Sequence, residues 1–396
     1  MKNYVICILD KSYPPEHSFV DGMLADELAA QARVFLLVSR GTCNRKVVRY
    51  GRAICLPILG PRTGVSRFLN FFLVLRALIF LRRRVKSRRI FVSIFVRNEP
   101  IYLIAAAVLK SQFERLVFQQ SFPHEKAESS VLKREFAKFL FRSASNRVDA
   151  ITAVSPTGLQ RLVSYFPCVK NSLVIPLLGS QSTRQESCIR KNLDSSESVK
   201  FLYVGSHSSQ RELSFVLRGI CLALQMKNNL QFTFIGGKED EVRALCNSEA
   251  VSNFVRNRVI QFHPRMPRDE LLKHMPNYDV GISLIPPTEV YAEASPTKLA
   301  EYMSSGLAIL ASNGIPSQEE FMKLSGGGIL TNWSVEDIAN SLITIASSRS
   351  KLDTFKISAF RFSEQSMNYS DLTNALLDLL FPQSVISGVR PKSGNE

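Results

Sequence analysis

The chain has 396 residues, of which 45% are hydrophobic and 21% charged, a composition that excludes a disordered or fibrous protein. A chain of this length usually folds into two domains, or three. The formal net charge is +16, and residues 1–175 hold 28 of the 50 Lys and Arg but only 11 of the 34 Asp and Glu. This first part therefore balances to +17 and the rest to −1. Such one-sided basic charge predicts a polyanionic partner surface, either nucleic acid or anionic lipid.

The seven cysteines are scattered and include no Cys-x-x-Cys pair. This pattern argues against a disulfide framework or a zinc site and favours a reducing compartment. The apolar run within residues 1–10 is too short for a signal peptide and is typical of a first buried strand. We therefore expect a cytoplasmic protein without a metal site.

Short apolar runs alternate with amphipathic stretches of helical length in the first half. The runs predict strands near 3–9, 34–38, 47–50, 89–95, 115–119, 149–154 and 172–176. The amphipathic stretches predict helices near 20–31, 66–83, 100–110, 130–143 and 156–165. Such alternation is typical of a doubly wound parallel sheet, so we expect a first Rossmann-like α/β domain over residues 1–178.

A second domain of the same class is predicted after a linker. Residues 179–198 are rich in Ser, Gln, Asn and charge and lack periodicity, as linkers do. Strands are then predicted near 199–205, 230–236, 258–262, 278–284 and 307–312, within a domain over 199–362. A last amphipathic helix is expected near 364–381, in a C-terminal segment, 363–396, that packs on either domain and ends in a polar tail.

The segment 66–89 combines an apolar stretch with eight Lys and Arg and no acid. Its apolar part, 68–81, contains Asn70 and Arg76 and is shorter than the roughly 20 residues of a membrane-spanning helix. Two interpretations stay open: a helix lying in the membrane interface, or a crossover helix buried against its sheet with a solvated basic end. Both hold if one face packs while the basic end touches lipid through Arg82, Arg83 and Arg84.

Nucleic acid is the weaker choice of partner. The basic run lacks the interleaved aromatic residues that single-strand binders use for stacking. The sequence also shows no helix-turn-helix or zinc pattern. We therefore expect an anionic membrane surface as the partner, and no nucleic acid.

A helix start after the predicted strand 280–285 carries the most informative pattern. Ser295 suits the N-cap, Pro296 the first helical position and Gly306 the C-terminal stop. The amides of Thr297 and Lys298 would then face the carboxyl end of a strand, where α/β sheets bind ligands and helix N-termini bind phosphate.

The same helix offers a charge and a carboxylate at useful positions. Lys298 adds positive charge beside the predicted phosphate position. Glu301, about one turn further on, is placed to accept both hydroxyl protons of a ribose. A diphosphate at the helix start and a ribose at a carboxylate predict a nucleotide-sugar site.

This stretch resembles the donor-site signature of glycosyltransferase family 4. Glu293 and Glu301 are separated by seven residues, and Ser-Pro-x-Lys-x-x-Glu-Tyr begins at Ser295. The resemblance implies the GT-B fold, with two Rossmann-like domains facing across a cleft. It also implies that Glu293 approaches the donor sugar and that Glu301 holds the ribose. The alternative is a surface helix with two solvated carboxylates.

The start of the second domain also resembles that family. Gly205 ends the first strand, and the resemblance implies that Arg211 reaches the diphosphate. Relatives often carry a Lys about five residues later, where this chain has Val216. Lys298 would then supply the second charge. The alternative for Arg211 is a solvated residue at a helix start.

Three places in the first domain are candidates for the acceptor side. Pro15 follows the first strand, as in the family's acceptor-side loop. Relatives place a His near the donor sugar, and His124 is the candidate here, with a surface His as the alternative. Arg97 and Asn98 lie at a strand end, where they either line the acceptor pocket or belong to a helix cap.

The resemblance implies a retaining, metal-independent glycosyltransferase. The sequence has no Asp-x-Asp motif, and no cofactor is expected beyond the nucleotide sugar as co-substrate. The resemblance and the basic first domain suggest a glycan or lipid-linked acceptor in cell-surface polysaccharide biosynthesis, at the inner face of the cytoplasmic membrane. The alternatives are another GT-B enzyme, such as a nucleotide-sugar epimerase or a sugar phosphorylase, and a non-catalytic membrane-associated relative.

Overall fold

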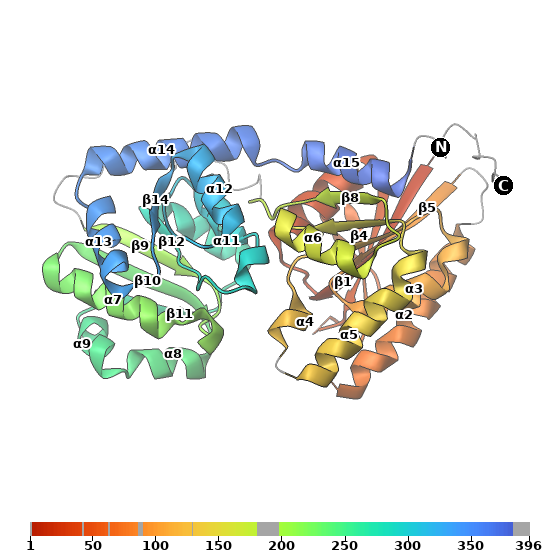
Figure 1. The fold of residues 1–396 in the computed structure, drawn as a ribbon, viewed down its shortest axis with the longest axis horizontal. Coiled ribbons are helices and arrows are strands. Elements are labelled where there is room, and N and C mark those ends of the chain that lie inside the picture. Colours follow the sequence, from red (N-terminus) through yellow and green to blue (C-terminus); the bar gives the residue numbers. More distant parts are fainter. Residues whose placement is uncertain are drawn as a thin grey trace. The chain divides into compact units, whose positions relative to one another are not determined.

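The computed structural model describes residues 2–41, 43–61, 64–85, 90–128, 130–179 and 198–382. The chain divides into two compact units, drawn in Figure 1: Met1–Pro176 with Tyr369–Glu396, and Leu177–Asn368. Each unit is a parallel sheet with helices on both faces, so the predicted fold class is confirmed. Most of the predicted linker, 180–197, lies outside the described residues.

The first unit contains an eight-stranded sheet in the order β3-β4-β2-β1-β5-β6-β7-β8. All neighbours are parallel except β3 and β4. The strand that the sequence did not predict is β4, because Pro57 interrupts its pattern. The strands are β1 Lys2–Ser12, β2 Arg33–Ser39, β3 Val48–Tyr50, β4 Ala53–Leu59, β5 Ile90–Arg97, β6 Leu116–Gln120, β7 Ala150–Ala153 and β8 Asn171–Val174.

Successive crossovers place four helices of this unit on one face of the sheet. Right-handed connections that advance in one direction along a sheet share a face, and α2, α3, α5 and α6 pack there on one apolar core with β1, β5 and β6. The helical segments are η1 Phe19–Leu28, wound as a π-helix, α1 Ala29–Gln31, α2 Gly64–Arg84, α3 Pro100–Val108, η2 Lys110–Gln112, α4 His124–Ala127, α5 Val131–Ala144, η3 Ser145–Arg147 and α6 Pro156–Tyr165. Among these, α3 is buried almost throughout.

The predicted single helix over 364–381 is wrong. Two helices occupy this region, α14 Arg349–Ser366 in the second unit and α15 Ser370–Leu380 in the first. The helix breaks because Met367 leaves the helical conformation, with φ −108° and ψ 60°. Tyr369 is buried and its ring meets Phe19 edge-on. The helix α15 therefore packs against η1, on the opposite face from α2.

The second unit is a six-stranded parallel sheet in the order β11-β10-β9-β12-β13-β14. Counted along the chain this order is 3-2-1-4-5-6, the arrangement of dinucleotide-binding folds. The strands are β9 Val199–Val204, β10 Leu230–Gly237, β11 Ile260–Pro264, β12 Val280–Ser283, β13 Ala308–Ser312 and β14 Gly328–Thr331. The sequence did not predict β14, which is short and begins with glycine.

Helices alternate with these strands on both faces of the sheet. They are η6 Ser209–Arg211, α7 Leu213–Met226, α8 Glu239–Cys246, α9 Glu249–Arg256, α10 Arg268–His274, η7 Met275–Asn277, η8 Tyr291–Glu293, α11 Thr297–Ser304, α12 Pro316–Ser325, α13 Val335–Ile345 and α14. As predicted, Gly306 follows the end of the helix after β12: α11 ends at Ser304, its C-cap is Ser305, and Gly306 has a φ of +75°.

Each sheet has one point where the strand order reverses, between β1 and β5 in the first unit and between β9 and β12 in the second. In open α/β sheets, ligands bind outside the carboxyl ends of the strands at such a point. The polar residues at these two edges are therefore the places to look for a site.

Leu376 tests the packing of α15, because its side chain is fully buried in the first unit. Leu376→Ala is expected to destabilise this unit by about 2–5 kcal/mol, the usual cost of such a cavity. Hydrogen exchange of first-unit peptides measures the loss, while the fluorescence of Trp333, in the second unit, serves as an internal reference. Leu324→Ala, at an exposed position, is the control. An effect as small as the control's would contradict the packing of α15.

Candidate functional site

Two glycines lie at the carboxyl ends of β9 and β10, next to the reversal point of the second sheet. Gly205 follows β9 with a φ of +149°, and Gly236 in β10 has a φ of +122°. A Cβ on Gly236 would lie 2.7 Å from the carbonyl oxygen of Gly205. Only glycine fits this approach, which brings two stretches of backbone together where a ligand would approach the sheet.

Tyr302 fixes helix α11 against the end of β9. The backbone N–H of Val204 donates to the Tyr302 hydroxyl at 2.7 Å. The ring packs on Gly281 of β12, where an added Cβ would lie 2.3 Å from it. Gly281 and Tyr302, the last residue of the Ser-Pro-x-Lys-x-x-Glu-Tyr motif, thus together position α11.

The predicted N-cap of α11 is wrong. Helix α11 begins at Thr297 with Pro296 as its N-cap, and none of the described side chains caps it. The Ser295 hydroxyl instead accepts a hydrogen bond from the Leu177 backbone N–H at 2.9 Å, because it is used to hold the chain that enters this unit. The first-turn amides of Thr297 and Lys298, with the partial positive charge of the helix, remain at the tip.

Lys298 buries its amine beside this tip. Its Nζ lies 4.1 Å from the ring centroid of Tyr203 and, among the described residues, has no hydrogen-bond partner. Burial, and secondarily Arg211, lowers the pKa of Lys298 well below 10.5. A buried amine with a second cation nearby and no hydrogen-bond partner among the described residues is costly for the fold. An anion is the ligand whose binding would offset that cost.

Arg211 approaches the same place from η6. Its guanidinium carbon lies 4.8 Å above the ring centroid of Tyr291. Burial raises the pKa of Tyr203 to about 12, against the opposing effect of Arg211. Gly205, Arg211 and Lys298, singled out in the sequence, therefore gather at one edge. The two tyrosines were missed because an aromatic residue in a strand or loop is usually part of the core.

Glu301 is held by a residue that the sequence analysis missed. Arg268, the first residue of α10, contacts Glu301 Oε1 through Nε at 3.1 Å and Nη2 at 2.6 Å. Both side chains are nearly buried. Because the fork engages Oε1, the other oxygen, Oε2, lies outside it. No sequence signal links the two, since they are 33 residues apart and meet only through packing. Glu293 ends η8 and is buried, and its role stays a prediction.

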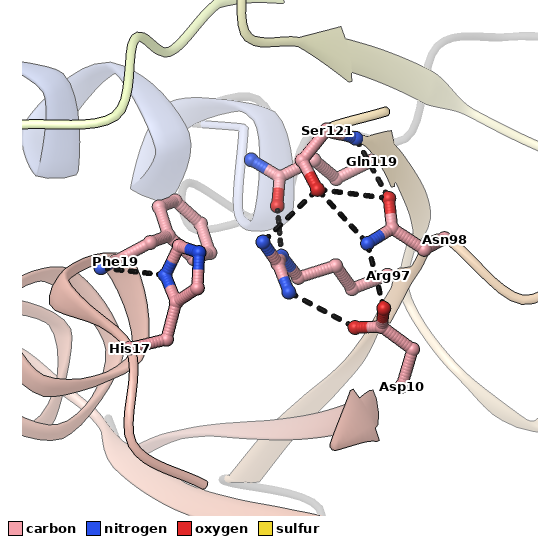
Figure 2. A network of polar contacts seen from close by, with 7 residues as sticks. All are labelled: Asp10, His17, Phe19, Arg97, Asn98, Gln119 and Ser121. Atoms are coloured by element: carbon pink, nitrogen blue, oxygen red, sulfur yellow. Dashed lines mark hydrogen bonds and ion pairs between the residues drawn. The ribbon is translucent and has the colours of Figure 1, made fainter. Parts of the chain in front are cut away.

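The first unit carries a polar network at its own reversal point (Figure 2). Arg97, at the end of β5, donates to Asp10 Oδ1 at 2.9 Å, Gln119 Oε1 at 3.1 Å and Ser121 Oγ at 3.0 Å. Asn98 donates to Asp10 Oδ2 and Ser121 Oγ, both at 2.9 Å. Asn98 has a φ of +62°, a left-handed conformation that Asn tolerates.

This network is largely buried and joins the carboxyl ends of β1, β5 and β6. Arg97 is only 1% exposed, and its guanidinium also lies over the ring of Phe19. The N-cap of α3 is Glu99 rather than Arg97 or Asn98, and the Glu99 carboxylate also pairs with Arg67. Arg97 is therefore placed to position the loops around it. A contact of Arg97 or Asn98 with an acceptor stays a prediction.

The remaining candidates of the first unit lie in loops at this edge. Pro15 is buried in the loop after β1. His17, in the same loop, accepts a hydrogen bond from the Phe19 backbone N–H at its Nδ1, as Figure 2 shows. His124 begins α4, is exposed, and its ring meets that of Phe122. The catalytic role predicted for His124 is untested, as is the acceptor role of Pro15.

In the described part of the chain, no group of three or more His, Cys, Asp or Glu side chains is arranged to hold a metal ion.

Comparisons with known proteins place this geometry in a wider context. Residues 185–361 match the family model described as Glycosyl transferases group 1. This match covers most of the second unit. The chain is therefore a glycosyltransferase, as predicted. A search of curated proteins found no significant match to the sequence.

Solved structures resemble the chain over nearly its whole length. A sucrose-phosphate synthase from Thermosynechococcus elongatus is 14% identical with a TM-score of 0.74, covering 98% of this chain and 100% of its own. Anabaena HepE in complex with UDP is 14% identical with a TM-score of 0.64, and the match covers 98% of this chain and 100% of HepE. A trehalose-phosphate synthase from Burkholderia xenovorans is 11% identical with a TM-score of 0.67, and the match covers 96% of this chain and 100% of that protein. At these identities the likeness shows the GT-B fold.

Lys298→Met is expected to stabilise the second unit by about 1–3 kcal/mol, since it removes a buried polar group without a partner. The lowered pKa means that the folded protein holds this proton less tightly than the unfolded chain does. Between the lowered pKa and 10.5, wild-type stability therefore rises with pH, and the variant loses this rise. Urea unfolding followed by Trp333 fluorescence measures the free energy of unfolding and its dependence on pH. The exposed Lys323→Met variant is the control. If Lys298→Met instead destabilises the unit, the conclusion that the Lys298 amine is buried without a partner is wrong.

Proposed function

We propose that the second unit binds a nucleoside-diphosphate sugar at the edge between β9 and β12. One observation carries this proposal: the Lys298 amine is buried beside Arg211, and the described residues offer it no partner. A diphosphate supplies the missing negative charge and can also accept hydrogen bonds from the first-turn amides of α11. Binding an anion favours the protonated amine, so the donor would offset the cost of burying Lys298.

The ribose is assigned to Glu301. Arg268 fixes the carboxylate through Oε1 and leaves Oε2 to accept the ribose hydroxyls. Glu301 follows Lys298 by three residues on the same helix, so the two side chains lie on neighbouring positions of one face. A diphosphate on Lys298 with a ribose on Glu301 fits the order of groups in a nucleotide donor.

The proposed reaction transfers the sugar with retention of configuration and without a metal, as the resemblance to glycosyltransferase family 4 implies. The bond from the anomeric carbon to the diphosphate breaks while a bond to the acceptor oxygen forms. The acceptor hydroxyl approaches from the leaving-group side and gives its proton to the departing diphosphate. Arg211, Lys298 and the helix amides stabilise the negative charge that develops there. Glu293 and His124 are assigned to the donor sugar.

Uridine diphosphate sugars are the first donors to test, because HepE was solved with UDP. For the acceptor we propose a glycan, carried on lipid, in cell-surface polysaccharide assembly. Pro15, Arg97 and Asn98 are its assigned contacts or supports. We place this lipid-linked chemistry at the inner face of the cytoplasmic membrane. The described part of the chain contains no helix long and apolar enough to span it.

The basic end of α2 supports this location, with one refinement. Arg82 donates to the backbone carbonyls of Gln112 and Val85, both at 2.8 Å, so it also closes the helix end. Arg83 and Arg84 are exposed, and Arg84 lies over the ring of Phe80. The two outer arginines are therefore the side chains to contact anionic headgroups.

Glu301→Ala is expected to weaken nucleotide binding by about 10- to 100-fold and to abolish transfer, because charged hydrogen bonds contribute about 1.5–3 kcal/mol. Calorimetry with UDP-, GDP- and ADP-sugars first identifies the donor of the wild-type protein. The same titrations with the 2′-deoxy form of that nucleotide then locate the contact. Wild type should prefer the ribonucleotide, and Glu301→Ala should not discriminate. The exposed Glu336→Ala is the control, and near-normal activity in Glu301→Ala would refute the assignment.

Removing charge from Arg83 and Arg84 together should weaken binding to anionic vesicles by about 30-fold, at about 1 kcal/mol for each residue near the surface. Co-sedimentation of the Arg83→Gln, Arg84→Gln double variant measures this, and a melting curve checks that it stays folded. Arg243→Gln with Arg256→Gln, two exposed arginines of the second unit, is the matched control. Unchanged sedimentation of the first pair would count against membrane attraction.

A further inference from the structure

The helical layer of the first unit has an unusual distribution of apolar side chains. The helix α3 contacts both α2 and α5, and the three run side by side on one face of the sheet. Because α3 is almost fully buried, the outward surface of these three helices is formed by α2 and α5. We call it the α2–α5 surface, comprising the exposed side chains of Gly64–Arg84 and Val131–Ala144.

On α2 the exposed apolar residues form one stripe. Phe72, 65% exposed, and Phe68 are four residues apart, and Phe80 continues the line two turns later. The spacing keeps them on one helix face, opposite the buried Val74, Leu78 and Leu81. Val65 and Leu69 extend the stripe. One face of α2 thus packs on the sheet while the other presents aromatic side chains outward.

The helix α5 repeats this arrangement, which the sequence analysis did not foresee. Leu132 is 84% exposed, and Phe136 and Phe139 follow at helical spacing. The opposite face buries Phe141 and Ala144. Among the described residues, nine of the fourteen exposed large hydrophobics belong to α2 or α5. The other five are scattered over both units, as single exposed apolar residues usually are.

Basic side chains accompany both stripes. On α5 these are Lys133, Arg134, Lys138 and Arg142, and the one acid of the helix, Glu135, is paired with Lys138 at 2.8 Å. On α2 the exposed basic end follows Phe80. Apolar stripes with basic flanks match an anionic lipid leaflet, which accepts aromatic rings at the acyl boundary and cations at the headgroups. A second copy of the chain would instead set like charges against each other.

We propose that the α2–α5 surface inserts into an anionic membrane, with α2 and α5 as two parallel interfacial anchors and their phenylalanines at the acyl boundary. This deepens the membrane location given under the proposed function. It adds α5 as a second anchor, equal in importance to α2. It also specifies that the phenylalanines insert into the membrane, whereas the arginines alone would only attract the protein to its surface. The proposed diphosphate and ribose contacts, Arg211, Lys298 and Glu301, lie in the other unit and include none of these residues.

Vesicle binding of paired variants tests the proposal. The α5 pair is Phe136→Ser with Phe139→Ser, the α2 pair is Phe68→Ser with Phe72→Ser, and the control pair is Met226→Ser with Leu324→Ser, exposed apolar residues of the second unit. Vesicles of phosphatidylcholine with about one-third phosphatidylglycerol serve as the probe. Each first-unit pair should lower the partition coefficient by about tenfold or more, and the control pair should not. Full binding by the α5 pair would overturn the proposal.

Insertion is distinguished from attraction by a tryptophan at the surface. In Phe136→Trp, the added fluorescence should shift to the blue on anionic vesicles and be quenched by brominated acyl chains. Absence of quenching, or equal binding to pure phosphatidylcholine, would contradict the proposal. So would a vesicle-independent dimer that the α5 pair dissociates in ultracentrifugation, since the occupant would then be a second copy. Calorimetric donor binding should be unchanged in every pair, which separates this proposal's failure from that of the donor site.

Discussion

The buried Lys298 amine is the feature on which the proposed donor site depends. It lies over Tyr203 and near Arg211, at the edge where the second sheet reverses its strand order. A fold keeps such a pair only if the surrounding packing determines it strongly. Tyr302 supplies that packing, since it joins α11 to β9 through its hydroxyl and to β12 through its ring. The cations are therefore held in advance of any anion.

The two units use the same topological feature for opposite purposes. In the first, Arg97 finds partners in Asp10, Gln119 and Ser121, so the charge at the reversal point is balanced within the protein. In the second, the charge lacks an acidic partner among the residues described. A balanced network stiffens the loops that it joins, whereas unbalanced charge recruits a ligand. This difference is why the donor is assigned to the second unit.

The first unit carries basic side chains on its surface, along α2 and α5. The sheet and α3 supply its apolar core, which leaves the outer faces of α2 and α5 free to combine phenylalanines with Lys and Arg. The proposed diphosphate and ribose contacts and the proposed membrane contact therefore involve different residues. Each can be altered by substitution without touching the residues of the other.

The sequence by itself determined the strand and helix alternation, the motif around α11 and the basic excess, because these depend on local spacing and composition. Its resemblance to glycosyltransferase family 4 implied that Arg211 and Lys298 act on one diphosphate after the strand that Gly205 ends, and the structure brings these residues to one edge. Only the tertiary structure showed that Arg268 holds Glu301, that Ser295 serves Leu177 rather than α11, and that the last predicted helix is two. These outcomes depend on side chains that meet through packing over long separations, which no local pattern encodes.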